Sequence, residues 1–263
     1  MKHTKVYWIW QIFYPIGIYY VVSSLAYFVL ELLMGSDNET YMLRQLVCSA
    51  VTIPFVMKFY SEDRRQREVV YGKRSFRLDA GEVRNILFSL ISAATLGMAV
   101  NNIIAMTPLM EVSGGFETAN EAFFGGQLIY ELLGSCLLIP IAEELIFRGV
   151  VYRRLRVLLG VGPAVLCSAL IFGIVHFNLV QFIYAAILGC LLAFLYEKTG
   201  FFYAPVLGHM AANTVAVLRQ ETGWLAFSYQ PTAAGIGFTL LMLAAAFAVI
   251  GYMWKECRKE KQS

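Results

Sequence analysis

The sequence predicts an all-α polytopic membrane protein with about eight transmembrane helices and both termini in the cytoplasm. Of its 263 residues, 59% are hydrophobic and only 15% are charged, whereas soluble domains average about 45 to 50% apolar and about 25% charged residues. The apolar runs recur along almost the whole chain and leave no connection long enough to fold on its own. We therefore expect residues 1–263 to form a single membrane domain.

Each run of about 20 mostly apolar residues is a candidate span. In chain order the candidates are Tyr7–Met34, Met42–Tyr60, Ile86–Met106, Phe124–Phe147, Val161–Phe177, Leu179–Tyr196, Phe201–Leu218 and Thr232–Trp254. The first is too long for the apolar core of a signal peptide, so we expect it to be retained as a helix. The fifth to the seventh are short and closely joined.

The connections between these runs predict the orientation of the chain. Basic residues gather after the second span, after the fourth span and in the C-terminal tail, whereas the first and third connections carry no Lys or Arg. Because basic loops stay in the cytoplasm, this alternation places both termini there. The net charge of +3 therefore indicates orientation and contact with membrane lipid, not nucleic acid. The five cysteines show no CxxC spacing, which argues against a disulfide framework or a thiolate metal site.

A few strongly polar residues lie inside the predicted spans and need a reason, because a charge at the bilayer centre costs about 2.5 to 3.5 kcal/mol on insertion scales. They are Glu143, Glu144, Arg148, His176, His209 and Asn213. Residues four apart share a helix face, so Glu144 is placed to pair with Arg148, and His209 and Asn213 form one polar stripe. Adjacent residues are about 100° apart around a helix, so Glu143 must have different neighbours.

A glutamate and two histidines are the residues that water activation needs. A carboxylate or imidazole takes the proton, and polarised donors such as an amide stabilise the developing oxyanion. The sequence contains no GxSxG and no HExxH, so a serine triad or a standard zincin helix is unsupported. Glu131, Asn101 and Asn102 are interpreted as residues that form hydrogen bonds between helices or lie at the membrane interface, with the lining of a pathway as the alternative.

Three short segments carry a family resemblance. "EELIFRG" (143–149), "FGIVH" (172–176) and "HMAAN" (209–213) resemble, in order and spacing, the EExxxR, FxxxH and HxxxN motifs of the CAAX prenyl endopeptidase and bacteriocin-processing family. This family is also called the Abi or CPBP intramembrane proteases. The resemblance covers residues 139–217, and we place the motif-bearing core at residues 124–218.

The resemblance implies an intramembrane endopeptidase. By that analogy Glu143 activates water with His176, while His209 and Asn213 stabilise the tetrahedral intermediate. Glu144 is also assigned to the catalytic residues, because which of the two glutamates activates water stays open; if Glu143 is the base, Glu144 and Arg148 hold the helix in place or orient Glu143. Arg148 and Phe172 are expected to support the site. Family members are described both as metalloproteases and as metal-independent glutamate proteases, so zinc held by Glu143, His176 and His209 stays an alternative to a site that requires no cofactor.

The predicted positions of His176 and His209 along their spans oppose a site shared by the two histidines. At about 1.5 Å per residue, His176 lies about 24 Å along its span from Gly160, whereas His209 lies only about 12 Å along its span from Phe201. The two histidines can act together only if they come within about 12 Å of each other, the range of contact through one water.

The expected substrate is a peptide or a protein tail, such as a pheromone, a bacteriocin or its leader, or a lipid-modified tail, reached from the cytoplasmic side of a bacterial cytoplasmic membrane. Two other functions are open. A proton-coupled transporter would use the same Glu, His and Arg as a relay, although it predicts polar residues along a continuous path through both leaflets. A catalytically silent scaffold or immunity protein would retain the fold alone.

Overall fold

The computed structural model describes residues 5–72 and 75–260, and within these ranges all regular elements are helices. This confirms the predicted all-α class. The chain divides into two compact units, each described by itself below. Unit 1 contains the described residues up to Arg77 together with Ala122–Ser168, and unit 2 contains Leu78–Glu121 and the described residues from Ala169 onward. The single membrane domain stays a prediction, and the motif-bearing core, residues 124–218, is divided between the units.

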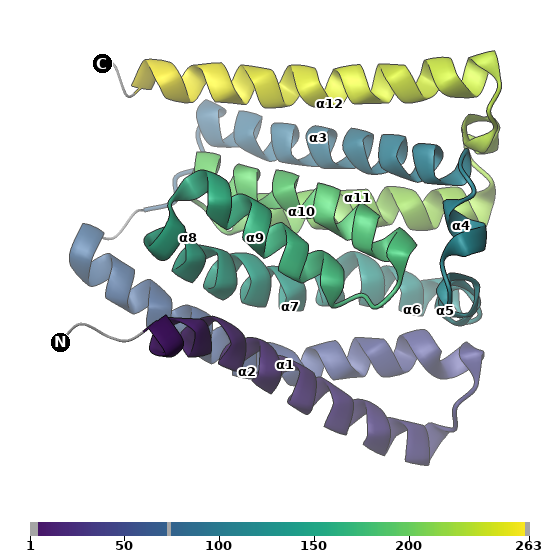
Figure 1. Ribbon diagram of the computed structural model, residues 1–263, viewed down its shortest axis with the longest axis horizontal. Coiled ribbons are helices and arrows are strands. Elements are labelled where there is room, and N and C mark those ends of the chain that lie inside the picture. The colour runs from purple at the N-terminus through teal and green to yellow at the C-terminus, as the bar shows by residue number, and fades with distance from the viewer. Residues whose placement is uncertain (1–4, 73–74, 261–263) are drawn as a thin grey trace. The chain divides into compact units, whose positions relative to one another are not determined.

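Unit 1 is built on two long helices and one long interrupted helical run (Figure 1). Its elements are α1 (Lys5–Met34), α2 (Asn38–Tyr71), α6 (Leu128–Leu133), the π-helix η1 (Gly134–Leu138), α7 (Ile139–Glu144), the π-helix η2 (Leu145–Tyr152) and α8 (Arg153–Leu159). Both α1 and α2 pack against η2. The second helix continues past the predicted end of its span at Tyr60, because its polar residues also favour helix.

Unit 2 is a bundle in which α3 packs against three partners, α10, α11 and α12. Its elements are α3 (Ala80–Ala105), α4 (Leu109–Val112), α10 (Leu179–Thr199), α11 (Tyr203–Thr222), the 3₁₀-helix η3 (Ala226–Tyr229) and α12 (Ala233–Glu260). The division between the units falls inside α5 (Phe116–Phe123) and inside α9 (Val161–Ile174). Figure 1 shows α12 running alongside α3.

Local signals fix the ends of the helices that carry the motifs of unit 2. The Asn178 side chain caps α10 by accepting a hydrogen bond from the backbone N–H of Gln181 at 2.8 Å. Gly200 ends α10 with φ 70° and Gly223 ends α11 with φ 68°, a left-handed conformation that glycine adopts at no steric cost. These caps set the lengths of α11, which contains the "HMAAN" segment, and of α10, which precedes it.

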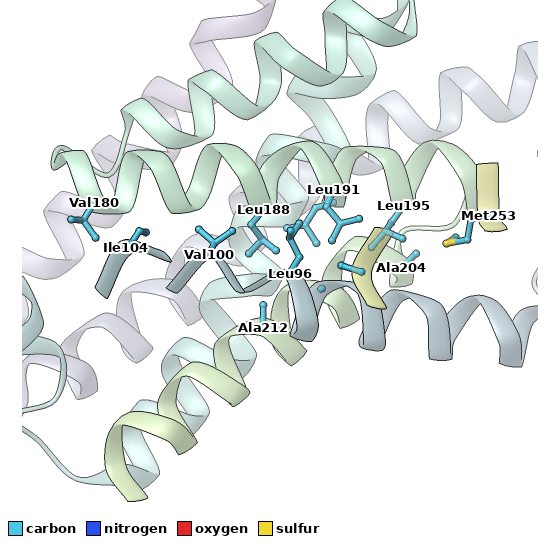
Figure 2. Packing of buried hydrophobic residues seen from close by; sticks show 13 residues of the cluster. Leu96, Val100, Ile104, Val180, Leu188, Leu191, Leu195, Ala204, Ala212 and Met253 are labelled. Atoms are coloured by element: carbon cyan, nitrogen blue, oxygen red, sulfur yellow. The ribbon is translucent and has the colours of Figure 1, made fainter. Parts of the chain in front are cut away.

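The core of unit 2 is a layer of aliphatic side chains between α3, α10 and α11 (Figure 2). Leu96 and Val100 of α3 lie against Leu188 and Leu192 of α10, all at most 7% exposed. Burying one such side chain contributes about 1.5 to 3 kcal/mol in water, whereas lipid tails are as apolar as leucine, so close packing holds the helices together inside a bilayer.

Five described helices are long and apolar enough to cross a membrane: α1, α2, α3, α10 and α12. A sixth is added if α5 and the run Leu128–Leu159, bent by 108°, count as one span. These helices support the predicted integral membrane protein. With 14 residues, α9 reaches only about 21 Å, less than the about 30 Å of a bilayer core. The count of eight spans and the cytoplasmic termini stay predictions.

Candidate active site

The two adjacent glutamates lie at the end of α7, between two π-helical stretches. Pro140 occupies the first turn of α7, where its missing N–H is tolerated best. Single π-helical turns inside α-helices are rare and frequently mark functional sites. At Gly149 the helix approaches α2 so closely that a Cβ there would lie 2.6 Å from the ring of Tyr60. The absence of a side chain at Gly149 therefore lets the helix that carries this motif pack closely against α2.

Glu144 and Arg148 form the ion pair that their spacing predicts. The Arg148 guanidinium donates to Glu144 Oε1 at 2.8 Å, and both side chains are 0% exposed. A charge in an apolar interior is tolerated only with a partner, so each residue makes the other possible. This pair links the last residue of α7 to the first turn of η2.

Glu143 has a different environment from its neighbour, as the helix geometry predicts. Its side chain is partly exposed where Glu144 is fully buried. Tyr19 and Tyr20 of α1 both interact electrostatically with the Glu143 carboxylate. Sequence reasoning missed these two tyrosines, because an aromatic pair in an apolar run carries no motif and the register between α1 and α7 is not visible in the sequence.

His176 lies in a turn after α9 and not within a span that extends to Phe177. The helix ends at Ile174, and Phe177 has φ 59°, a left-handed conformation uncommon for a residue with a side chain. The Nδ1 atom of His176 lies 2.8 Å from the carbonyl oxygen of Phe172, one turn earlier. This contact fixes the imidazole ring and leaves Nε2 for another partner.

The two histidines of unit 2 meet around one aromatic ring. The Phe172 ring lies edge-on to His176 at 5.0 Å and to His209 at 5.9 Å between centroids. The imidazoles therefore come within the about 12 Å that a shared site requires. His209 is 5% exposed on α11, and Asn213 follows one turn later and is partly buried. The condition that the span-length argument set for the two histidines is therefore met.

Unit 2 thus brings together Phe172, His176 and His209, and Asn213 lies on α11 with His209. Unit 1 contains the residues of "EELIFRG". No group of three or more His, Cys, Asp or Glu among the described residues is placed to hold a metal ion. The predicted zinc ligands Glu143, His176 and His209 are divided between the two units.

A buried polar network at the C-terminal end of α11 is a second feature that sequence reasoning only partly found. Arg219, which is 1% exposed, donates to Asn102 Oδ1 at 2.6 Å and to Ser228 Oγ at 2.7 Å. Its guanidinium lies 4.1 Å from the centre of the Tyr229 ring, and Asn102 donates to Thr239 at 2.9 Å. The prediction that Asn102 bonds between helices is confirmed, and Arg219 was overlooked because the predicted span ended one residue before it.

Comparisons with known proteins agree with the motifs. Residues 125–215 match the family described as type II CAAX prenyl endopeptidase Rce1-like. The chain is similar to human CAAX prenyl protease 2, with 27% identity over 194 residues, which covers 60% of this chain and 58% of that protein. It is also similar to the membrane peptidase YdiL of Bacillus subtilis (strain 168), with 28% identity over 141 residues, 54% of this chain and 49% of that protein.

The chain thus spans about half the length of the curated relatives it matches. No solved structure matches it significantly. All three motifs lie inside the matched segment, so the predicted resemblance is confirmed. The motifs and the match agree that residues 125–215 are similar to the Rce1-like family of type II CAAX prenyl endopeptidases.

Proposed function

We propose that this protein is an intramembrane endopeptidase that cleaves a peptide or a protein tail with an activated water molecule. The contrast between the two adjacent glutamates carries the proposal: Glu144 is buried in an ion pair with Arg148, whereas Glu143 is partly exposed. A fully buried carboxylate in an ion pair serves structure, whereas a partly exposed carboxylate in the same helix can be reached by water. Both named relatives are described as proteases or peptidases, which supports the same reaction class.

In the proposed reaction Glu143 takes a proton from the attacking water, and His176 assists through the nitrogen that its backbone contact leaves available. His209 and Asn213 donate to the oxyanion that develops at the scissile carbonyl. Phe172 contributes by holding the two imidazoles around its ring.

The proposed substrate is an extended segment, because a site among membrane helices admits backbone that is not folded into a domain. A small peptide such as a pheromone or a bacteriocin leader fits this description, as does the lipid-modified tail of a small protein. We place the protein in a bacterial cytoplasmic membrane, with the site reached from the cytoplasm or from the membrane itself. These assignments extend the family resemblance to this chain.

We propose further that the reaction has no obligatory metal. Glu143, His176 and His209 are the residues that would hold zinc, and a ring nitrogen bonded to a backbone carbonyl, as in His176, is also the usual arrangement of a metal-binding histidine. Bound zinc would supply a Lewis acid for the carbonyl and the attacking water. A chelator therefore distinguishes the two forms of the site.

The test is cleavage of a mixed peptide library, including prenylated peptides, by the purified protein in detergent. The variants are Glu143→Gln and His209→Ala, and the control is Glu117→Gln, which removes an exposed glutamate of α5. We expect the first two to lose at least about a hundredfold in rate, because a positioned general base contributes about 10² to 10⁴ and a donor to the oxyanion about 10² to 10³. The control should cleave like the wild type, and cleavage should survive a chelator.

Each alternative outcome points elsewhere. Equal cleavage by wild type and Glu143→Gln would refute the proposed base. Loss of cleavage on chelation, with recovery on adding zinc, would replace the metal-independent reaction with a zinc-dependent one. An absence of cleavage together with proton flux across proteoliposomes would favour the transporter.

A further inference from the structure

The connection between α9 and α10 carries His176, and it also contains a polar residue that the three motifs do not include. The helix α9 ends at Ile174 and α10 begins at Leu179, so His176 lies among the connecting residues 175–178. Asn178 is the last of them and is partly buried. Because His176 lies outside both helices, the conformation of this connection determines where its ring points.

Packing of the Phe177 side chain does not hold this connection in shape. Phe177 has φ 59°, a left-handed conformation that is sterically unfavourable for a residue with a side chain, and its side chain is 85% exposed, so burial of the ring does not offset the cost. Two backbone hydrogen bonds fasten the first half of the connection to α9. The N–H of His176 donates to the carbonyl oxygen of Gly173 at 3.1 Å, and the N–H of Phe177 donates to that of Ile174 at 3.2 Å. The second half needs another support.

The Asn178 side chain supplies this support from the start of α10. Its Oδ1 atom accepts from the backbone N–H of Gln181 at 2.8 Å, and since a backbone nitrogen only donates, this contact determines the orientation of the amide. The Nδ2 atom then donates to Gln181 Oε1 at 2.7 Å and lies 3.5 Å from the carbonyl oxygen of His176. One amide therefore connects the backbone of His176 to the first turn of α10.

The end of α10 that Asn178 contacts is itself held in place. The backbone N–H of Val180 donates to Oγ of Ser113 at 3.2 Å, and Ser113 is only 5% exposed in the connection after α4. On the side of α9, a Cβ at Gly173 would lie 2.8 Å from the carbonyl oxygen of Phe182, so the two helices approach each other with no room for a side chain. Both ends of the connection are thus fixed, and the amide of Asn178 bridges the last part between them.

The orientation of the His176 ring depends on the position of its backbone. The Nδ1 atom lies 2.8 Å from the carbonyl oxygen of Phe172. Because a carbonyl oxygen only accepts, Nδ1 carries the proton and donates it. A shift of the His176 backbone by about 1 Å would lengthen this contact beyond the range of about 2.7 to 3.2 Å for such hydrogen bonds, and it would turn Nε2 to a new direction.

We propose that Asn178 is a positioning residue for the proposed endopeptidase reaction, and that its amide fixes the turn that directs Nε2 of His176 toward the reacting water. This inference rests on the proposed function for its kinetic consequence. The amide has two tasks: Oδ1 caps α10, whereas Nδ2 holds the connection next to His176. The tasks can be separated, because serine caps a helix about as well as asparagine but carries no amide.

The experiment compares Asn178→Ser and Asn178→Ala with the control Asp79→Ala, all purified in detergent. Asp79 caps α3 of the same unit by accepting from the N–H of Glu82 at 2.9 Å, so the control removes an equivalent cap on another helix. We expect Asn178→Ser to keep the melting temperature and to lower kcat by about tenfold to a hundredfold at little changed KM, because a misplacement of about 1 Å can cost about 10² in rate. Asn178→Ala should lose both, and Asp79→Ala only melting temperature. In a His176→Ala background, Asn178→Ser should have no further effect on kcat.

A second readout does not depend on activity. The chain has three histidines, so NMR of protein with isotope-labelled histidine gives few ring nitrogen signals, and His176→Ala identifies those of His176. In the wild type they should report a protonated Nδ1; they should shift or broaden in Asn178→Ser and stay unchanged in Asp79→Ala. If the wild type cleaves nothing, the proposed function fails while these signals still decide on the role of Asn178. Unchanged signals or an unchanged kcat in Asn178→Ser would overturn the inference, as would a further loss of kcat in the His176→Ala background.

Discussion

The ion pair between Glu144 and Arg148 gives a prediction whose magnitude depends on burial. Two arginine–glutamate pairs of nearly equal N···O distance differ in their burial: Arg148–Glu144 at 2.8 Å and Arg84–Glu256 at 2.9 Å. In the first pair both side chains are 0% exposed, and in the second they are 43% and 33% exposed. Any difference between their contributions therefore reports the environment and not the length of the contact.

Replacing Arg148 by methionine leaves the Glu144 charge in an apolar interior without this partner. Breaking a buried pair in this way costs about 3 to 5 kcal/mol, whereas an exposed pair contributes about 0 to 1 kcal/mol. We expect Arg148→Met to lower the free energy of unfolding by about 3 to 5 kcal/mol and Arg84→Met by less than about 1 kcal/mol. Since a typical domain is stable by about 5 to 15 kcal/mol, the first loss is severe.

The assay is reversible unfolding in mixed micelles of a mild detergent and dodecyl sulfate, followed by circular dichroism. The single variant Glu144→Gln and the double variant Glu144→Gln/Arg148→Met complete a cycle, and the double variant removes both charges and keeps similar side-chain volumes. We expect it to be more stable than Arg148→Met alone, since no unpaired charge remains. Equal losses for Arg148→Met and Arg84→Met, or a double variant as unstable as the sum of its parts, would refute the reasoning.

Three further changes test other parts of the structure by the same unfolding assay. Gly173→Ala places a Cβ 2.8 Å from the carbonyl oxygen of Phe182, so we expect a loss of about 1 to 3 kcal/mol from overpacking; a neutral result would contradict the close approach of α9 and α10. Arg219→Met removes the buried donor to Asn102 and should cost about 2 to 4 kcal/mol, whereas a stabilised variant would show that the network is dispensable. Arg154→Gln breaks a pair that is 15% and 14% exposed, so its cost should fall between the exposed and the buried case, at about 1 to 3 kcal/mol.

Helix positions and the neighbours within one helix were predictable from the sequence, because both follow from local rules. Apolar runs of sufficient length located α1, α3, α10 and α12 within several residues. The four-residue spacing of Glu144 and Arg148 predicted their ion pair, which the structure contains. The interhelical role of Asn102 followed from the need to satisfy an amide inside an apolar helix.

Features that depend on register between helices, or on a broken helix, were not predictable in the same way. His176 was placed inside a span because Val175 and Phe177 are apolar, yet the helix ends at Ile174 and a left-handed residue follows. Hydropathy does not report such a turn, because a buried turn can be as apolar as a helix. The approach of Tyr19 to Glu143 depends on how far α1 is shifted along α7, which no local rule determines.

The adjacent glutamates show how one helix can carry a structural and a chemical carboxylate at consecutive positions. A rotation of about 100° separates them, so one pairs with Arg148 inside its own helix and the other has a different, partly exposed environment. The buried pair fixes the helix, and a fixed helix in turn fixes the direction of Glu143. Loss of Arg148 therefore harms both stability and catalysis in the proposed function, whereas loss of Glu143 harms catalysis alone. The same reasoning explains why a membrane segment retains two costly acids side by side: the second makes the orientation of the first reproducible.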